Sequence, residues 1–305
     1  MTEIVEHTFV SGISRLTLPL PSGPKHVHCY VLEGDDGRIL VDTGIGGNDE
    51  WPEVDRIVIS HMHPDHVGGA AAAAEATGAS VHQGALDYAQ CERVWGSEDW
   101  PERIAAWFTA HGVPRESTDE LIEQGRAFRP FIRFVRHPEL LYEGSDVGGW
   151  RVVELPGHAD GHIGLLRDGV LVGGDTLLNR ISPAVGLYPE SRPDPLGDYL
   201  DTLRRLIELA PTVVYPGHGE PVENPAGRAA ELIEHHRHRL DDAESALDAE
   251  PRTGFELSHV LFPNASAPQQ RRFAVAETLS HLERLVAERR AARIQAVGNV
   301  SYTAK

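Results

Sequence analysis

Cysteine is scarce in this sequence, in which 305 residues include only Cys29 and Cys91. Two cysteines cannot make a disulfide framework, so we expect two small buried thiols in a reducing compartment. No run approaches the roughly 18 apolar residues that a membrane-spanning helix needs. The opening residues MTEIVEHTFVSG also lack the basic and apolar regions of a secretory signal. The sequence therefore predicts a soluble, cytoplasmic protein.

Basic residues are also few, because 28 Lys and Arg stand against 46 Asp and Glu, which gives a formal net charge of -18. Such a balance repels polyanions, so neither a nucleic acid nor an anionic membrane is an expected partner. The apolar share of 41% and the charged share of 24% are ordinary for a globular protein. A chain of this length can form one large core, or a large domain and a small one.

Short apolar runs separated by turn residues dominate two parts of the chain. In the first, VHCYVLEGDDGRILVDTG predicts two strands joined by a turn at 34–37, and DRIVIS predicts a third strand. In the second, residues 150–175 predict three strands, and LGDYLDTLRRLIELA predicts an amphipathic helix before the strand TVVYPG. The repeated order of strands and helices predicts an α+β fold, a four-layer αββα sandwich of two sheets with helices outside.

Two further segments depart from this pattern. Residues from about 85 to 143 are mostly helical in pattern and rich in aromatic residues, which predicts a helical insert. From Pro225 onward, two strong helices and a hairpin that turns at Gly298-Asn299 predict a small helical, winged-helix-like domain. We place one domain at 1–224 and the second at 225–305. The apolar stripes of the second domain are expected to pack on the first and to shape a pocket or a homodimer interface.

The densest group of chemically active side chains is His61-Met-His63-Pro-Asp65-His66, directly after a predicted buried strand. A loop at the end of a strand can turn all four side chains inward. Imidazole and carboxylate ligands suit zinc, iron or manganese, and the absence of nearby cysteine argues against a thiolate site. The motif therefore predicts a metal site.

Three more candidate ligands follow predicted strands, each beside glycine: His158 in LPGHADGH, Asp175 in LVGGDTL and His218 in YPGHGE. Glycine lets the backbone bring such a side chain into a crowded centre. The other histidines are expected to be packed or surface residues, although His162 lies near enough to His158 to approach the site. The run HHRHR at 235–239 predicts a solvated helix face or an interdomain contact.

The motifs HMHPDH, PGH, GGD and PGHG, in this order and with VDTG upstream, resemble the motif series of metallo-β-lactamase-fold hydrolases over residues 16–220. The C-terminal segment and SPAVGLYPESRPDPLGDYLDTL resemble the glyoxalase II-like branch that carries a winged-helix-like appendage. The resemblance implies one metal held by His61, His63 and His158, and a second held by Asp65, His66 and His218. It also implies that Asp175 bridges both metals and that Asp42 of VDTG orients ligands.

By this resemblance the chain is a metal-dependent hydrolase with two divalent ions, zinc first and iron or manganese as alternatives. Two such ions lower the pKa of a shared water, and the resulting bridging hydroxide would attack an ester, thioester or lactone carbonyl of a small-molecule substrate. Asp65 would orient the nucleophile or carry its proton. Two alternatives stay open on the same fold: a phosphodiesterase or nuclease, and an iron-dependent oxygenase.

Substrate contacts are expected outside the metal motifs. The insert contains Trp107 among several aromatic residues, and it forms either its own small core or a lid over the metals with an apolar wall. Arg133 is one of four closely spaced arginines at 126–136 of the same insert, and it could hold an anionic group of the substrate. Tyr188, in the segment typical of the branch, is the third expected contact.

Overall fold

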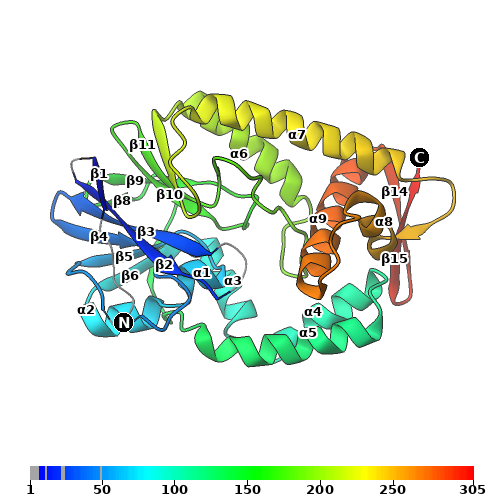
Figure 1. Ribbon diagram of the computed structural model, residues 1–305, viewed down its shortest axis with the longest axis horizontal. Helices are drawn as coiled ribbons and strands as arrows, with labels where there is room; N and C mark the ends of the chain where they lie inside the picture. Colours follow the sequence, from blue (N-terminus) through cyan, green and yellow to red (C-terminus); the bar gives the residue numbers. More distant parts are fainter. Residues whose placement is uncertain (1–6, 11, 22–24, 49) are drawn as a thin grey trace.

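The computed structural model describes residues 7–10, 12–21, 25–48 and 50–305. Two sheets pack face to face at one end of the molecule, with helices on their outer sides (Figure 1). Buried side chains of both sheets meet in one shared core, among them Leu32 and Val58 from the first sheet and Val152 and Leu165 from the second. The predicted four-layer αββα sandwich is confirmed.

The first sheet begins with antiparallel strands and ends with parallel ones. In the described residues its order is β1 (His7–Val10), β2 (Ile13–Pro19), β3 (His26–Gly34), β4 (Gly37–Val41), β5 (Arg56–Ile59), β6 (Ser80–Gly84) and β7 (Glu139–Leu141). The interior strand β3 is buried over six consecutive residues because it is covered on both faces, which explains its nearly continuous apolar sequence.

The second sheet is antiparallel except for one pair of strands, β11 and β12, which run parallel. Its spatial order is β12 (Val213–Pro216), β11 (Val170–Gly174), β10 (Ile163–Arg167), β9 (Trp150–Glu154) and β8 (Asp146–Val147). The strands predicted from WRVVELPG, IGLLRDG, VLVGGD and TVVYPG all form. Because β5, β9, β11 and β12 each lead directly into a loop with predicted ligands, the fold brings these loops to one edge of the sandwich.

Helices cover the outer faces of both sheets. On the first sheet lie α1 (Pro64–Val67), α2 (Ala70–Thr77) and α3 (Ala85–Val94), which bury Val67, Ala73 and Cys91 against its strands. On the second lies α6 (Pro195–Leu209), whose start is capped by the Asp194 carboxylate accepting the Gly197 N–H at 2.9 Å. Across the described ranges, no helix is both long and apolar enough to cross a membrane.

The predicted insert contributes to the sandwich and also extends beyond it. Its first helix, α3, and its last strand, β7, belong to the first sheet and its cover. Between them α4 (Trp100–Ala110), α5 (Arg115–Phe128) and the short 3-10 helix η1 (Arg129–Phe131) run along one side of the molecule toward the C-terminal helices (Figure 1). Phe108 and Val113 are buried in the same core as Leu257 and Leu279. The insert therefore does not form an isolated core of its own.

The C-terminal segment forms α7 (Pro225–Ser245), β13 (Arg252–Thr253), α8 (Gly254–Leu261), α9 (Pro268–Ala287), β14 (Ala291–Ala296) and β15 (Asn299–Ala304). The two long helices and the terminal hairpin agree with the prediction, but α8 was not expected. It begins at Gly254, directly after the short strand β13. The likeness to a winged helix and the boundary at 224/225 stay predictions.

Candidate metal centre

The HMHPDH loop is held in place at Met62 by two side chains, one in the first turn of α3 and one directly after its end. The Met62 N–H donates to the Asp87 carboxylate at 2.8 Å, and the Trp95 indole N–H donates to the Met62 carbonyl at 2.8 Å. Pro64 then starts α1, whose first turn presents Asp65 and whose last turn presents His66. The loop backbone is thus fixed at the residue between two predicted ligands, so their side chains turn to the same side.

The first group of possible ligands consists of His61, His63 and His158. His63 Nδ1 lies 3.1 Å from His61 Nε2 and 2.8 Å from His158 Nε2. His61 is fully buried and the other two are largely enclosed. Three imidazole nitrogens that converge at such spacing can share one cation.

The second group consists of Asp65, His66 and His218. The Asp65 carboxylate lies 3.9 Å from His66 Nε2 and 3.3 Å from His218 Nε2. Gly217 is required here because a Cβ at this position would collide with the Asp175 carboxylate and the His66 ring. This glycine of the PGHG motif therefore has a steric explanation.

Asp175 lies between the two groups. Its Oδ2 is 3.5 Å from His66 Nε2 and 3.3 Å from His218 Nε2. The same oxygen lies 3.7 Å from His158 Nε2 in the first group. The structure thus brings together all seven residues that the sequence proposed as metal ligands.

The ring nitrogens that face away from the centre have acceptors that define the histidine tautomers. His66 Nδ1 donates to the Asp42 carboxylate at 2.8 Å. His158 Nδ1 and His218 Nδ1 donate to the carbonyls of Ala184 and His26 at 2.7 and 2.8 Å. With a proton held on Nδ1, Nε2 is the nitrogen of each ring that faces the centre, where a metal can replace a proton on it, as metal-binding histidines require.

Two buried polar atoms at the centre confirm that these residues fit a metal. His66 Nε2 and Asp175 Oδ1 are buried and have no hydrogen-bond partner among the residues that the structure describes. An unsatisfied buried acceptor is costly unless a cation or a donor fills the space beside it. The donor set of imidazoles and carboxylates, with no thiolate, matches divalent zinc, iron or manganese.

Asp42 connects this centre to the sheet. Its carboxylate accepts the Ser60 N–H and the Ser60 hydroxyl, both at 2.7 Å, besides the His66 ring. Its backbone has a φ of 63°, an uncommon conformation that asparagine and aspartate adopt more easily than most residues. These contacts place Asp42 where it can orient His66, the role that the resemblance implied.

The carboxylates strongly influence the electrostatics of the second group. Burial alone would raise the pKa of Asp65, but His66 and His218 outweigh it and hold that pKa at about 2. Burial would lower the pKa of His218, yet hydrogen bonds to Asp175 and Asp65 raise it to about 10. In the first group, burial and neighbouring His158 lower the pKa of His63 to about 3. The negative carboxylates thus favour positive charge at their end of the centre.

Several supporting residues were missed or undervalued in the sequence. His162 is buried, its ring stacks on His61 with 4.7 Å between centroids, and its Nε2 accepts the Asp175 N–H at 3.1 Å. Ser60 contacts His61 Nδ1 at 3.0 Å. Ser60 directly precedes the motif, so its position was a usable signal. Asp87 carried no such signal, because it lies 25 positions after Met62, the residue that it contacts.

The three predicted substrate contacts lie at different places. Trp107 packs on His111 and Phe108, with ring centroids 4.3 and 5.1 Å away, at the core that includes the C-terminal helices. Arg133 is exposed and pairs with Glu75 at 2.7 Å. Tyr188 lies on the loop after Asp175 and packs on the same core as Trp107. The structure does not gather these three residues with the metal ligands, and their part in substrate binding stays a prediction.

Five imidazoles and two carboxylates converge at one edge of an αββα sandwich, and together they define a metal-binding protein. Residues 22–218 match the family described as the metallo-beta-lactamase superfamily, and residues 240–304 match its metallo-beta-lactamase-like, C-terminal domain. The chain belongs to the metallo-β-lactamase superfamily, as its motifs indicated.

Similarities to individual proteins support this assignment. The chain is 30% identical to the probable metallo-hydrolase YqjP of Bacillus subtilis, across 90% of this chain and 92% of that protein. It is 26% identical to the hydroxyacylglutathione hydrolase of Methylobacillus flagellatus, across 74% and 72% of the two chains. The crystal structure of the metallo-beta-lactamase family protein TTHA1429 from Thermus thermophilus matches with a TM-score of 0.85 and 34% identity, over 98% of this chain and 100% of that one. The chain is a metallo-hydrolase whose His/Asp cluster can hold divalent metal.

Proposed function

We propose that the chain is a binuclear hydrolase that cleaves an ester, thioester or lactone bond of a small molecule. The observation that carries this proposal is the position of the Asp175 carboxylate. Its Oδ2 lies within 3.5 Å of His66 Nε2 and 3.7 Å of His158 Nε2, which belong to different ligand groups. A carboxylate in this position is suited to two cations that share it.

Two adjacent divalent cations, when bound, supply an activated water near neutral pH and an electrophilic contact for a carbonyl oxygen. The proposed ligands are those of the two groups, with Asp175 shared between them: His61, His63 and His158 for one cation, and Asp65, His66 and His218 for the other. Asp65 is the most exposed carboxylate of the centre, with 23% of its side chain accessible. It is therefore placed to take a proton from the attacking water and to return it to the leaving group.

Other nucleophiles have less support. Both cysteine thiols are fully buried, and burial raises the pKa of Cys29 and of Cys91 well above its usual range. A buried neutral thiol is a poor nucleophile. A hydrolysis that uses water activated at the centre therefore fits this chain better than a covalent acyl-enzyme.

An acyl substrate has two lines of support. A relative is named a hydroxyacylglutathione hydrolase, and it is similar to this chain over about three quarters of its length. The net charge of -18 also opposes long polyanionic substrates. In the experiment below, phosphodiester cleavage is the competing outcome, and the alternative of iron-dependent oxygen chemistry predicts an iron-loaded protein that hydrolyses none of the substrates.

The experiment is a steady-state comparison of kcat/KM on small thioesters, esters, lactones and phosphodiesters, with metal content measured on every sample. We expect turnover of a carbonyl substrate, and a loss of at least about a hundredfold in Asp65→Asn. Asp168→Asn is the matched control, because Asp168 is 93% exposed in a turn of the second sheet. Preferential cleavage of phosphodiesters would contradict the proposal.

A further inference from the structure

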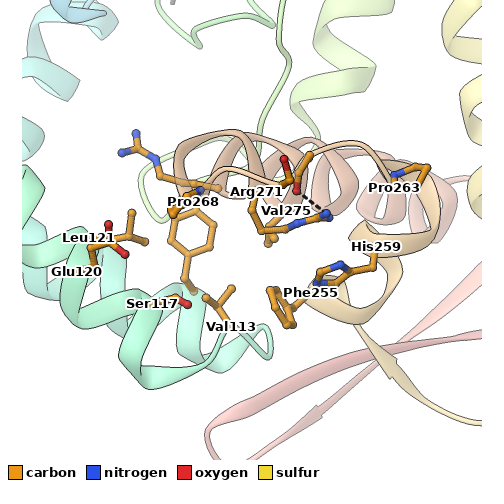
Figure 2. A pocket seen from close by; sticks show the side chains of 14 residues that line it. Val113, Ser117, Glu120, Leu121, Phe255, His259, Pro263, Pro268, Arg271 and Val275 are labelled. Atoms are coloured by element: carbon orange, nitrogen blue, oxygen red, sulfur yellow. Dashed lines mark hydrogen bonds between the residues drawn. The ribbon is translucent and has the colours of Figure 1, made fainter. Parts of the chain in front are cut away.

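A cavity of about 400 Å³ lies away from the metal ligands, between α5 of the insert and helices α8 and α9. Figure 2 shows Val113 and Leu121 on one side of it, Val275 on α9 above, and Phe255 on α8 opposite. Phe108 from α4 completes an apolar wall. Ligand pockets typically have about this volume and this predominance of apolar side chains.

Most polar groups that line the cavity already have partners. Arg271 donates to the carbonyls of Ser258, Phe262 and Ala265 at 2.8, 3.1 and 2.6 Å, which holds the loop between α8 and α9. Glu120 accepts from the Gln124 amide at 2.9 Å. Burial and the nearby Arg271 lower the pKa of His259, so this ring is neutral at pH 7. Arg271 is thus engaged by the loop, and Glu120 keeps its negative charge at the exposed α5 side of the cavity.

Arg272 differs from Arg271 because its Nε is buried without a hydrogen-bond partner in the described part of the chain. Its guanidinium hydrogen-bonds the neutral Tyr188 hydroxyl, and no carboxylate of the described residues pairs with it. Burial raises the pKa of the neighbouring Tyr188 hydroxyl, and Arg272 acts in the opposite direction. A half-buried guanidinium with no anionic partner is uncommon in a chain of net charge -18. The positive charge of Arg272 can pair with the negative charge of a bound anion.

We propose that this cavity binds a small amphipathic anion of the class of medium-chain carboxylic acids. Its apolar body would lie against Leu121 and Phe255, and its carboxylate would pair with Arg272. The volume suits roughly a dozen carbon-sized groups, at about 30 Å³ each. A guanidinium binds a carboxylate through two parallel hydrogen bonds, which gives this end of the ligand its specificity. The proposal concerns binding alone and does not depend on the reaction at the metal centre.

The test is a displacement assay on the full-length protein, in which decanoate competes with the fluorescent fatty acid cis-parinaric acid. Decan-1-ol is the matched neutral competitor. Two variants fill the cavity from opposite sides, Ser117→Trp on α5 and Ala265→Trp on the loop before α9. Neither position is part of the buried core, so both variants are expected to fold.

We expect both tryptophan variants to weaken decanoate binding by at least about tenfold. Arg272→Met should weaken decanoate by about tenfold and leave decan-1-ol unchanged, because it removes a charged hydrogen bond and keeps the apolar stem. Arg115→Met, an exposed arginine of α5 outside the cavity, is the control and should bind both ligands as the wild type does. Wild-type affinity in both tryptophan variants, unchanged decanoate binding in Arg272→Met, or no displacement by decanoate at all would overturn the proposal.

Discussion

Single residues explain how this centre is held in shape before any metal binds. Asp42 is fixed by two hydrogen bonds from Ser60, and it in turn fixes the ring of His66. The backbone carbonyls of Ala184 and His26 fix the rings of His158 and His218 in the same way. No substitution of the Ala184 or His26 side chain removes these carbonyls. Asp42 is therefore the orienting contact that mutation can test most cleanly.

The first prediction is that Asp42→Asn lowers metal affinity by about 10- to 100-fold, since it replaces the carboxylate that His66 Nδ1–H contacts. Asparagine tolerates the positive φ of this position, so the backbone should not be the cause. Isothermal titration of the metal-free protein measures the affinity. Asp168→Asn, at a second positive φ of 50°, is the matched control and should bind as the wild type does.

A further pair of buried histidines is not among the predicted ligands. His236 of α7 and His281 of α9 are 0% and 2% exposed, and their facing nitrogens are 3.5 Å apart. His281 Nδ1 donates to the Glu277 carbonyl at 2.8 Å. Burial lowers the pKa of His236 to about 3 and that of His281 to about 4. HHRHR was expected to be a solvated face or an interdomain contact, and His236 is fully buried.

The second prediction follows from the sign of these shifts. Below pH 6.5 the unfolded chain protonates His236 while the folded chain does not, so stability falls as the pH drops toward 3. Between pH 7 and 5 this residue should cost about 2 kcal/mol of unfolding free energy. Urea unfolding should show a smaller loss in His236→Gln. His238→Gln, on the exposed side of the same helix, should keep the wild-type loss; equal losses in both variants would refute the assignment.

At the scale of elements, the sequence predicted the helices and strands that a local residue pattern identifies. The strands around the ligands and the long helices have clear periodicity or turn residues at their ends, and the glycine-flanked ligand motifs lie at strand ends. Helix α8 was missed because it is only eight residues long and directly follows the short strand β13. Its start depends on a capping box, in which the Thr253 hydroxyl accepts the Glu256 N–H at 3.2 Å and the Glu256 carboxylate accepts the Thr253 N–H at 2.8 Å.

The third prediction tests this cap. Thr253→Ala should lower the free energy of unfolding by about 1 kcal/mol, because it removes the side-chain acceptor at the helix N-terminus. Thr253→Ser keeps the hydroxyl and should lose less than half as much. Urea unfolding at pH 7 measures both variants, and equal losses would mean that the methyl group, and not the cap, stabilises α8.

At the scale of the whole molecule, one core joins parts that are far apart in sequence. Leu203 of α6, Phe108 of the insert and Leu279 of α9 belong to the same buried cluster. The aromatic insert was predictable as helices, but its packing against the C-terminal segment was not, because no local pattern encodes a contact between residues 108 and 279. The same limit hid Asp87 and Trp95, whose support of the metal loop depends on tertiary structure.

The fourth prediction is that Leu279→Ala lowers the free energy of unfolding of the entire chain by about 2 to 5 kcal/mol, in one cooperative transition. Leu279 is 0% exposed. Leu86→Ala, at a position that is 44% exposed, should change it by less than about 0.5 kcal/mol. Two separate transitions, with only one of them shifted, would show that the C-terminal segment unfolds by itself.

The central claim is that two divalent ions share Asp175, and metal stoichiometry by mass spectrometry of purified protein tests it most directly. The account predicts close to two ions per chain in the wild type and in Asp168→Asn. It predicts a clear loss of occupancy in Asp175→Ala, where two cations would lack their shared carboxylate, and the loss of one ion in His218→Ala. A single ion per chain, unaffected by His218→Ala, would contradict the binuclear centre.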